Sequence, residues 1–98
     1  MINLEPCELD CLKTILRKHL PNYTVYLFGS RVTPNIKPYS DIDLAIMSKT
    51  PIPTITMALL QNELAESDLP YKVDLVDWAR ADESFQSIIN QRYEVILD

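Results

Sequence analysis

Apolar residues recur along the chain at two spacings, one typical of helices and one typical of strands. Near the start, five apolar positions fall on one side of a helix: Leu9, Leu12, Ile15, Leu16 and Leu20. Pro6 stands where the first turn of a helix tolerates a proline. The pattern therefore predicts an opening amphipathic helix.

Two later segments alternate as β-strands do. Residues 23–28, YTVYLF, are apolar on both alternating faces, which predicts a central strand covered on both sides. Residues 33–40 contain two prolines and predict a loop that follows a brief helical turn. Residues 41–47, DIDLAIM, predict a second strand in which Asp41 and Asp43 point to the same face.

The second half of the chain continues with helix and strand patterns. A helix is predicted over about residues 54–67, because apolar positions there share one side: Ile55, Ala58, Leu59 and Ala65. Pro70 ends this helix. Residues 71–78 predict a third strand, which places Asp74 and Val76 on the face opposite Val73 and Leu75.

A final helix precedes an apolar segment at residues 95–97. Asp82 is placed to cap this helix. The helix includes Phe85, Ile88, Ile89 and Arg92. The 98 residues suffice for one packed domain over 1–98, and nearly half of them are hydrophobic.

Charge and composition exclude several classes of function. The formal net charge is -5, and no run of Lys or Arg is long enough to follow a nucleic-acid backbone, so direct nucleic-acid binding is not expected. The start of the chain has no signal-like pattern and no apolar stretch is long enough to span a bilayer, so we expect a cytoplasmic protein without membrane contact. Cys7 and Cys11 lie four residues apart and are interpreted as reduced packing cysteines.

Gly29 is the only glycine of the chain and directly follows the first predicted strand. The end of a strand before a helical turn offers free N–H groups to a phosphate, and the missing Cβ lets an anion approach the backbone. Ser30 adds a hydroxyl at the same place. A Gly-Ser pair alone is a weak signal, because it commonly does nothing but turn the chain.

Three aspartates strengthen the signal. Asp41 and Asp43 share one strand face, and Asp74 lies in an otherwise apolar strand, where an unpaired charge is costly. Together they would hold one or two divalent cations through oxygen atoms. The alternative is that Asp41 caps its strand while the other two lie on a solvated sheet face, but one metal-nucleotide site accounts for the glycine and all three aspartates together.

Two further titratable residues are assigned structural roles. Asp77 falls on the opposite strand face from Asp74 and precedes the end of the strand, so we expect it to cap or form a turn. His19 is the only histidine and lies near the end of the first helix, where the helix dipole accounts for it better than catalysis does.

At these residues the sequence resembles the minimal nucleotidyltransferases of the DNA polymerase β-like superfamily. Their signature is Gly-Ser, ten residues, then Asp-x-Asp, and Gly29-Ser30 and Asp41-Ile42-Asp43 fall at that spacing. The resemblance extends through GSRV, SDIDLAI and KVDLVDW. It implies an α/β (α+β) fold of the polymerase β palm type, in which helices flank a small mixed β-sheet.

The resemblance also implies a chemistry. Gly29 and Ser30 would bind the triphosphate of ATP, and Arg31 would neutralise phosphate charge, although an exposed arginine on a solvated face is nearly as good an account of it. Asp41 and Asp43 would ligate Mg²⁺ in a two-metal site. Asp74 would be the third metal ligand and would help to deprotonate an acceptor hydroxyl, which attacks the α-phosphorus and releases pyrophosphate.

Pro34 departs from the family pattern, since many members carry a second glycine at that position. Proline fixes the backbone and lacks an N–H, so the nucleotide loop is expected to have a different shape.

Small domains of this type resemble the antitoxins of toxin-antitoxin pairs in which the partner is a helical HEPN-domain toxin. The implied function is transfer of AMP from ATP to a tyrosine of the toxin, within a homo- or hetero-oligomer. An alternative from another class is a non-catalytic antitoxin that neutralises its partner by occlusion, and the acidic charge suits docking to a basic partner. Pro34 favours that alternative, whereas the three aspartates favour the enzyme.

Overall fold

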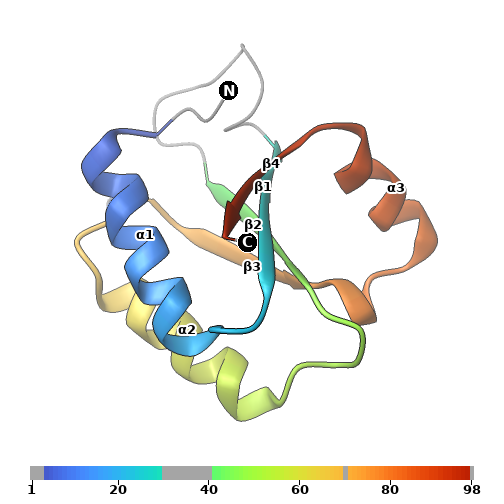
Figure 1. The fold of residues 1–98 in the computed structure, drawn as a ribbon, viewed down its shortest axis with the longest axis horizontal. Coiled ribbons are helices and arrows are strands. Elements are labelled where there is room, and N and C mark those ends of the chain that lie inside the picture. The colour runs from blue at the N-terminus through green and yellow to red at the C-terminus, as the bar shows by residue number, and fades with distance from the viewer. Residues whose placement is uncertain (1–3, 30–40, 70, 98) are drawn as a thin grey trace.

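A single four-stranded sheet forms the centre of the protein, seen in a computed structural model that describes residues 4–29, 41–69 and 71–97. The strand order is β3-β2-β1-β4 (Figure 1). β1 (Thr24–Phe28) pairs antiparallel with β2 (Ile42–Met47) and with β4 (Tyr93–Leu97). β3 (Val73–Asp77) runs parallel to β2, so the sheet is mixed, as the family resemblance implies, and the predicted central position of the first strand is confirmed.

Helices cover both faces of this sheet. α1 (Pro6–His19) and α2 (Thr54–Glu66) contact each other on one face, and α3 (Glu83–Gln91) lies on the other (Figure 1). A short 3-10 helix, η2 (Trp78–Arg80), connects β3 to α3. Asp82 caps α3 as predicted, because its carboxylate accepts a hydrogen bond from the Phe85 N–H at 2.8 Å.

α1 forms where the apolar spacing predicts it, and a capping box fixes its start. The backbone N–H of Glu5 donates to the Glu8 carboxylate at 3.0 Å, and the Glu5 side chain in turn accepts from the backbone at the third helical position. Four members of its predicted apolar stripe are buried, and Leu9 packs partly against them: Leu12, Ile15, Leu16 and Leu20.

The two sides of the sheet carry separate hydrophobic clusters. The larger cluster lies between the sheet and the α1–α2 pair, and its strand members include Val25, Leu27 and Leu44. The smaller cluster lies beneath α3 and consists of Phe28, Ala45 and Ile89, with Tyr26, Met47, Val76 and Trp78 packed around it. Side chains of the second face therefore belong to alternate residues of β1, β2 and β3.

The predicted apolar side of α2 is wrong. Ile55 and Leu59 are 66% and 53% exposed, whereas Leu60 and Leu64 are buried against the larger cluster. Apolar residues occur on more than one side of this helix, so their spacing does not identify the side that packs. Ala58 and Ala65 are exposed as well.

Exposure differs from expectation at two other places. Cys7 is exposed, while Cys11 is half-buried against the larger cluster, and both are free thiols. On α3, Ile89 is buried but Ile88 is 58% exposed. Within the described segments, no helix has the length and apolarity that crossing a bilayer requires.

Candidate active site

Three strand ends meet at one edge of the sheet. β1 ends there at Phe28, and β2 and β3 begin there, because β1 is antiparallel to β2 and β2 is parallel to β3. The register pairs Phe28 with Asp43, and Asp43 with Asp74. The two aspartates are therefore direct neighbours on adjacent strands, and both side chains lie on the face that carries α3. Asp41 is exposed and immediately precedes β2.

The carboxylates of this edge repel one another. Partial burial raises the pKa of Asp43, and the negative charges of Asp74 and then Asp41 raise it further. Lys72 Nζ lies 3.7 Å from Oδ1 of Asp74, but the lysine side chain is 73% exposed. The site thus carries negative charge that a bound cation would relieve.

Gly29 directly follows β1 and has a left-handed backbone, with φ of 78°. A Cβ at this position would collide with the carboxylate of Asp43. The sequence suggested that a ligand needs the space beside this glycine, and the structure reveals that the Asp43 side chain already fills part of it. Positive φ and this close approach together explain why a glycine stands here.

The nucleotide loop proper lies outside the described residues. Ser30, Arg31 and Pro34 fall in the segment 30–40, as does the loop expected at residues 33–40. Their predicted roles remain predictions.

The carboxylate set fits a divalent cation by its chemistry, since Asp41, Asp43 and Asp74 offer only oxygen donors and Mg²⁺ prefers oxygen. The mutual repulsion at Asp43 is the electrostatic condition that a cation satisfies. Within residues 4–29, 41–69 and 71–97, no group of three or more His, Cys, Asp or Glu side chains is gathered closely enough to hold a metal ion. The carboxylates would therefore have to turn toward a shared ion.

Asp77 has the structural role that its position predicts. Its carboxylate accepts hydrogen bonds from the Ser48 hydroxyl, from the Ile52 N–H at 2.8 Å and from the Ala79 N–H at 3.2 Å. Arg80 Nε lies 3.4 Å from Oδ2. This single buried side chain joins the end of β2, the segment before α2 and the start of η2.

The hydrogen bonds also determine the ionisation of Asp77. Burial by itself acts to raise the pKa, but the bonds from Ser48, Ile52 and Ala79, with Arg80 nearby, outweigh it and lower the pKa of this carboxyl. The capping role follows from the sequence, whereas Ser48 and Ile52 are partners that strand alternation could not reveal.

His19 connects α1 and α2 on the face of the sheet opposite α3. Its Nε2 lies 2.8 Å from Oε1 of Glu63 on α2, and Lys18 Nζ lies 3.0 Å from the same atom. Hydrogen bonds from His19 and then Lys18 lower the pKa of Glu63. His19 is in the last turn of α1 as expected, but sequence reasoning missed Glu63, which is 44 residues away.

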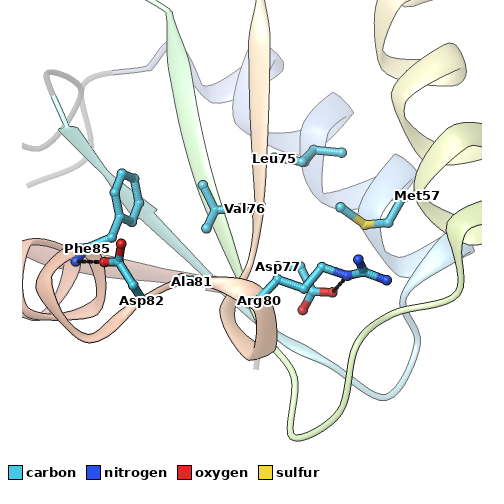
Figure 2. Close-up of a pocket in the computed structure, with 8 residues that line it drawn as sticks. All are labelled: Met57, Leu75, Val76, Asp77, Arg80, Ala81, Asp82 and Phe85. Carbon is cyan, nitrogen blue, oxygen red and sulfur yellow. Dashed lines mark hydrogen bonds and ion pairs between the residues drawn. The ribbon is translucent and has the colours of Figure 1, made fainter.

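An open pocket of about 490 Å³ lies along the outer edge of β3 (Figure 2). Its walls come from α2, β3, η2 and α3, so residues from position 57 to position 85 contribute to it. No local pattern in the sequence signals it, because none of these elements forms the pocket alone.

Comparison with known proteins identifies relatives of the whole domain. A family model described as polymerase beta, nucleotidyltransferase matches residues 11–98. A probable protein adenylyltransferase, MntA, of Haemophilus influenzae is 46% identical over 97 residues, which cover 99% of this chain and 85% of that protein. Spectinomycin 9-adenylyltransferase of Enterococcus faecalis is 40% identical over 47 residues, covering 46% of this chain and 18% of that enzyme.

Solved structures agree with this relationship. A crystal structure of a toxin-antitoxin with AMP-PNP superposes with a TM-score of 0.75 at 27% identity, covering 90% of this chain and 71% of that one. The structure of a tri-AMPylated Shewanella oneidensis HEPN toxin in complex with MNT antitoxin superposes with a TM-score of 0.71 at 26% identity. The match covers 95% of this chain and 71% of that one. The resemblance inferred from the Gly-Ser and Asp-x-Asp spacing is confirmed, and the chain belongs to the polymerase β nucleotidyltransferase family.

Proposed function

We propose that this protein transfers AMP from ATP to a tyrosine hydroxyl of a HEPN-domain toxin and so acts as an antitoxin. Support comes from the family, from the relative named a probable protein adenylyltransferase, and from the neighbouring structure of an AMPylated HEPN toxin with its MNT antitoxin. A cytoplasmic location belongs to the same proposal, since ATP is the donor.

The observation that carries this proposal is the pairing of Asp43 with Asp74 on adjacent parallel strands. Their carboxylates lie side by side on one face, at the edge where β1 ends in Gly29. A structural role for both would leave two repelling carboxylates with only the exposed Lys72 near Asp74, whereas phosphoryl transfer requires such a group of acidic ligands.

Asp41, Asp43 and Asp74 would hold Mg²⁺ in this site, and we propose that the site binds two metal ions. When bound, the cations neutralise phosphate charge and favour ionisation of the attacking hydroxyl. Asp74 takes the proton of the tyrosine hydroxyl. The tyrosine oxygen then bonds to the α-phosphorus, the bond from the α-phosphorus to the bridging oxygen breaks, and pyrophosphate leaves.

The donor nucleotide would lie where β1 ends. Gly29, Ser30 and Arg31 would contact the triphosphate, the glycine through its backbone and the arginine through its charge. This assignment rests on the family signature, and its test is calorimetric titration of ATP with Mg²⁺ into the wild type and into Arg31→Ala.

The transfer itself is tested with a purified HEPN-domain toxin, ATP and Mg²⁺. The wild type should add one or more adenylate masses to a toxin tyrosine, and Asp74→Asn should reduce the rate by about a hundredfold or more while still forming the complex. Asp10→Asn, an exposed aspartate on α1, is the matched control and should transfer normally. Equal neutralisation by wild type and Asp74→Asn, without added mass, would instead establish occlusion.

A further inference from the structure

β3 forms one edge of the sheet, and part of its backbone faces outward. The Ile42 N–H donates to the Lys72 carbonyl at 2.9 Å, so residue 72 and every second residue after it direct their backbone groups toward β2. Val73, Leu75 and Asp77 therefore direct theirs away from the sheet.

Two of these outward positions have partners for their carbonyl groups. The Val73 carbonyl accepts a hydrogen bond from Nε2 of Gln61 at 3.0 Å, and the Asp77 carbonyl accepts from the Ala81 N–H at 3.1 Å. Between them, the N–H and C=O of Leu75 have no partner in the part of the chain that the structure describes. Unpaired groups at a strand edge are a template for a further strand.

Apolar side chains flank Leu75 on both sides of the sheet. Figure 2 shows Met57 beside Leu75 on the α2 side, and Val76 and Phe85 on the α3 side. They line the open pocket of about 490 Å³. Side chains of an extended peptide alternate between two faces, so successive residues of one added strand would contact both groups of apolar side chains.

We propose that the edge of β3 binds an extended segment of the polypeptide that accepts AMP, through strand pairing at Leu75. This inference rests on the proposed function and adds the mode in which the acceptor is held. A helix could not use the Leu75 groups, because its own backbone groups are already paired, whereas an extended segment supplies both a donor and an acceptor.

The position of Asp74 connects this edge to the chemistry. Asp74 immediately precedes Leu75 on the same strand, and its side chain, 44% exposed, lies on the face of Val76. Residues opposite each other on paired strands have Cβ atoms about 4.5–5.5 Å apart. A tyrosine opposite or diagonal to Asp74 would therefore bring its side chain next to the carboxylate that takes its proton.

Peptide binding tests this inference without requiring transfer. The probe is a seven-residue peptide of alternating valine and threonine with a central tyrosine, added to the ¹⁵N-labelled protein. We expect its binding to shift the Leu75 amide signal and to slow exchange of that hydrogen with solvent. The same peptide, N-methylated at every peptide bond, has no N–H to donate to the Leu75 carbonyl, and its methyl groups prevent close approach to the strand edge, so it should produce neither effect.

A matched pair of α2 variants tests the apolar contacts. Met57→Lys puts a charge into the pocket and should weaken peptide binding about tenfold or more, whereas Ile55→Lys, at an exposed position of the same helix, should not. ATP binding should be unchanged in both. If Met57→Lys does not fold, the N-methylated peptide still decides the question.

Several results would overturn the proposal: no peptide binding, equal binding of the N-methylated peptide, or signal changes that avoid Leu75. Changes at Leu75 on raising the protein concentration alone would assign the edge to self-association and would overturn it too. Peptide binding at Leu75 together with no AMP transfer to a HEPN-domain toxin would leave this inference standing and refute the proposed function.

Discussion

A side chain on residue 29 would occupy the space of the Asp43 carboxylate, so Gly29 and Asp43 constrain each other directly. The glycine allows β1 to end in a left-handed conformation, and it leaves room for a carboxylate on the neighbouring strand. A substitution at residue 29 should therefore change the position of the Asp43 side chain, and removal of the Asp43 carboxylate should make a side chain at residue 29 easier to accommodate.

Gly29→Ala should lower the free energy of unfolding by about 1–2 kcal/mol from the positive φ alone. It should also displace the Asp43 side chain and reduce AMP transfer. Urea unfolding and the transfer assay measure the two effects separately.

Two further variants separate strain from collision. Gly29→Asn tolerates the left-handed backbone but keeps the Cβ, so it should recover part of the stability and none of the activity. In an Asp43→Ala background, Gly29→Ala should cost less stability than in the wild type, because the collision is gone. Strict additivity of the two substitutions would refute the contact.

Asp43→Asn should separate activity from stability. Burial and the charges of Asp74 and Asp41 raise the pKa of Asp43, so a neutral side chain of the same shape relieves repulsion. We expect unfolding free energy at pH 7 to stay equal or rise, while metal-dependent transfer falls by about a hundredfold or more. Full transfer by this variant would refute the assigned site.

Asp77→Ala should destabilise the protein by about 3 kcal/mol, because it leaves the Ser48 hydroxyl and the Ile52 N–H buried without their acceptor. Denaturant unfolding measures this cost. Ser48→Ala removes its bond to Asp77 and the one that its hydroxyl accepts from the Ala79 N–H at 3.2 Å, but Asp77 still accepts from Ile52 and Ala79, so the cost should be about 1 kcal/mol. Comparable losses in the two variants would show that the carboxylate does not join the three segments.

The same carboxylate predicts how stability depends on pH. The folded pKa of Asp77 lies below the unfolded value of about 3.9, so ionisation stabilises the fold above that pH. This contribution should disappear as pH falls below about 4 and through the folded pKa. Unfolding free energies of wild type and Asp77→Asn should therefore converge as pH falls, and a constant difference would contradict the assignment.

Adjacent leucines on α2 should respond very differently to truncation. Leu60 is fully buried and Leu59 is 53% exposed, so Leu60→Ala should cost about 2–5 kcal/mol and Leu59→Ala less than about 0.5. Thermal or urea unfolding of the two variants compares them on one helix. Similar costs would mean that the outer face of α2 is covered in solution.

These leucines show where sequence reasoning fails. The existence of α2 follows from its apolar content and from the proline after it, but the packed side does not, because Ile55 and Leu59 form an apolar pair as convincing as Leu60 and Leu64. Only the shape of the sheet and the position of α1 select between them, and neither is encoded locally.

For the site, strand alternation was sufficient to place Asp41 and Asp43 on one face of their strand, and Asp74 on the face opposite Val73 and Leu75, because a period of two does not depend on neighbouring strands. Their exact register and the collision at Gly29 were not predictable, since both depend on pairing between segments far apart in sequence. The pocket at the edge of β3 was not predictable for the same reason, because Met57 and Phe85 come close to β3 only after the chain has folded.

The parallel pairing of β2 and β3 has a consequence for sequence variation among such domains. Strands in a sheet lie about 4.8 Å apart whatever length of chain connects them. The separation of Asp43 from Asp74 is therefore set by the ladder and not by the 30 residues between them, which include α2. Insertions or deletions in the turn after α2 should leave the spacing of the two carboxylates intact, so loop length is free to change there while the site geometry persists.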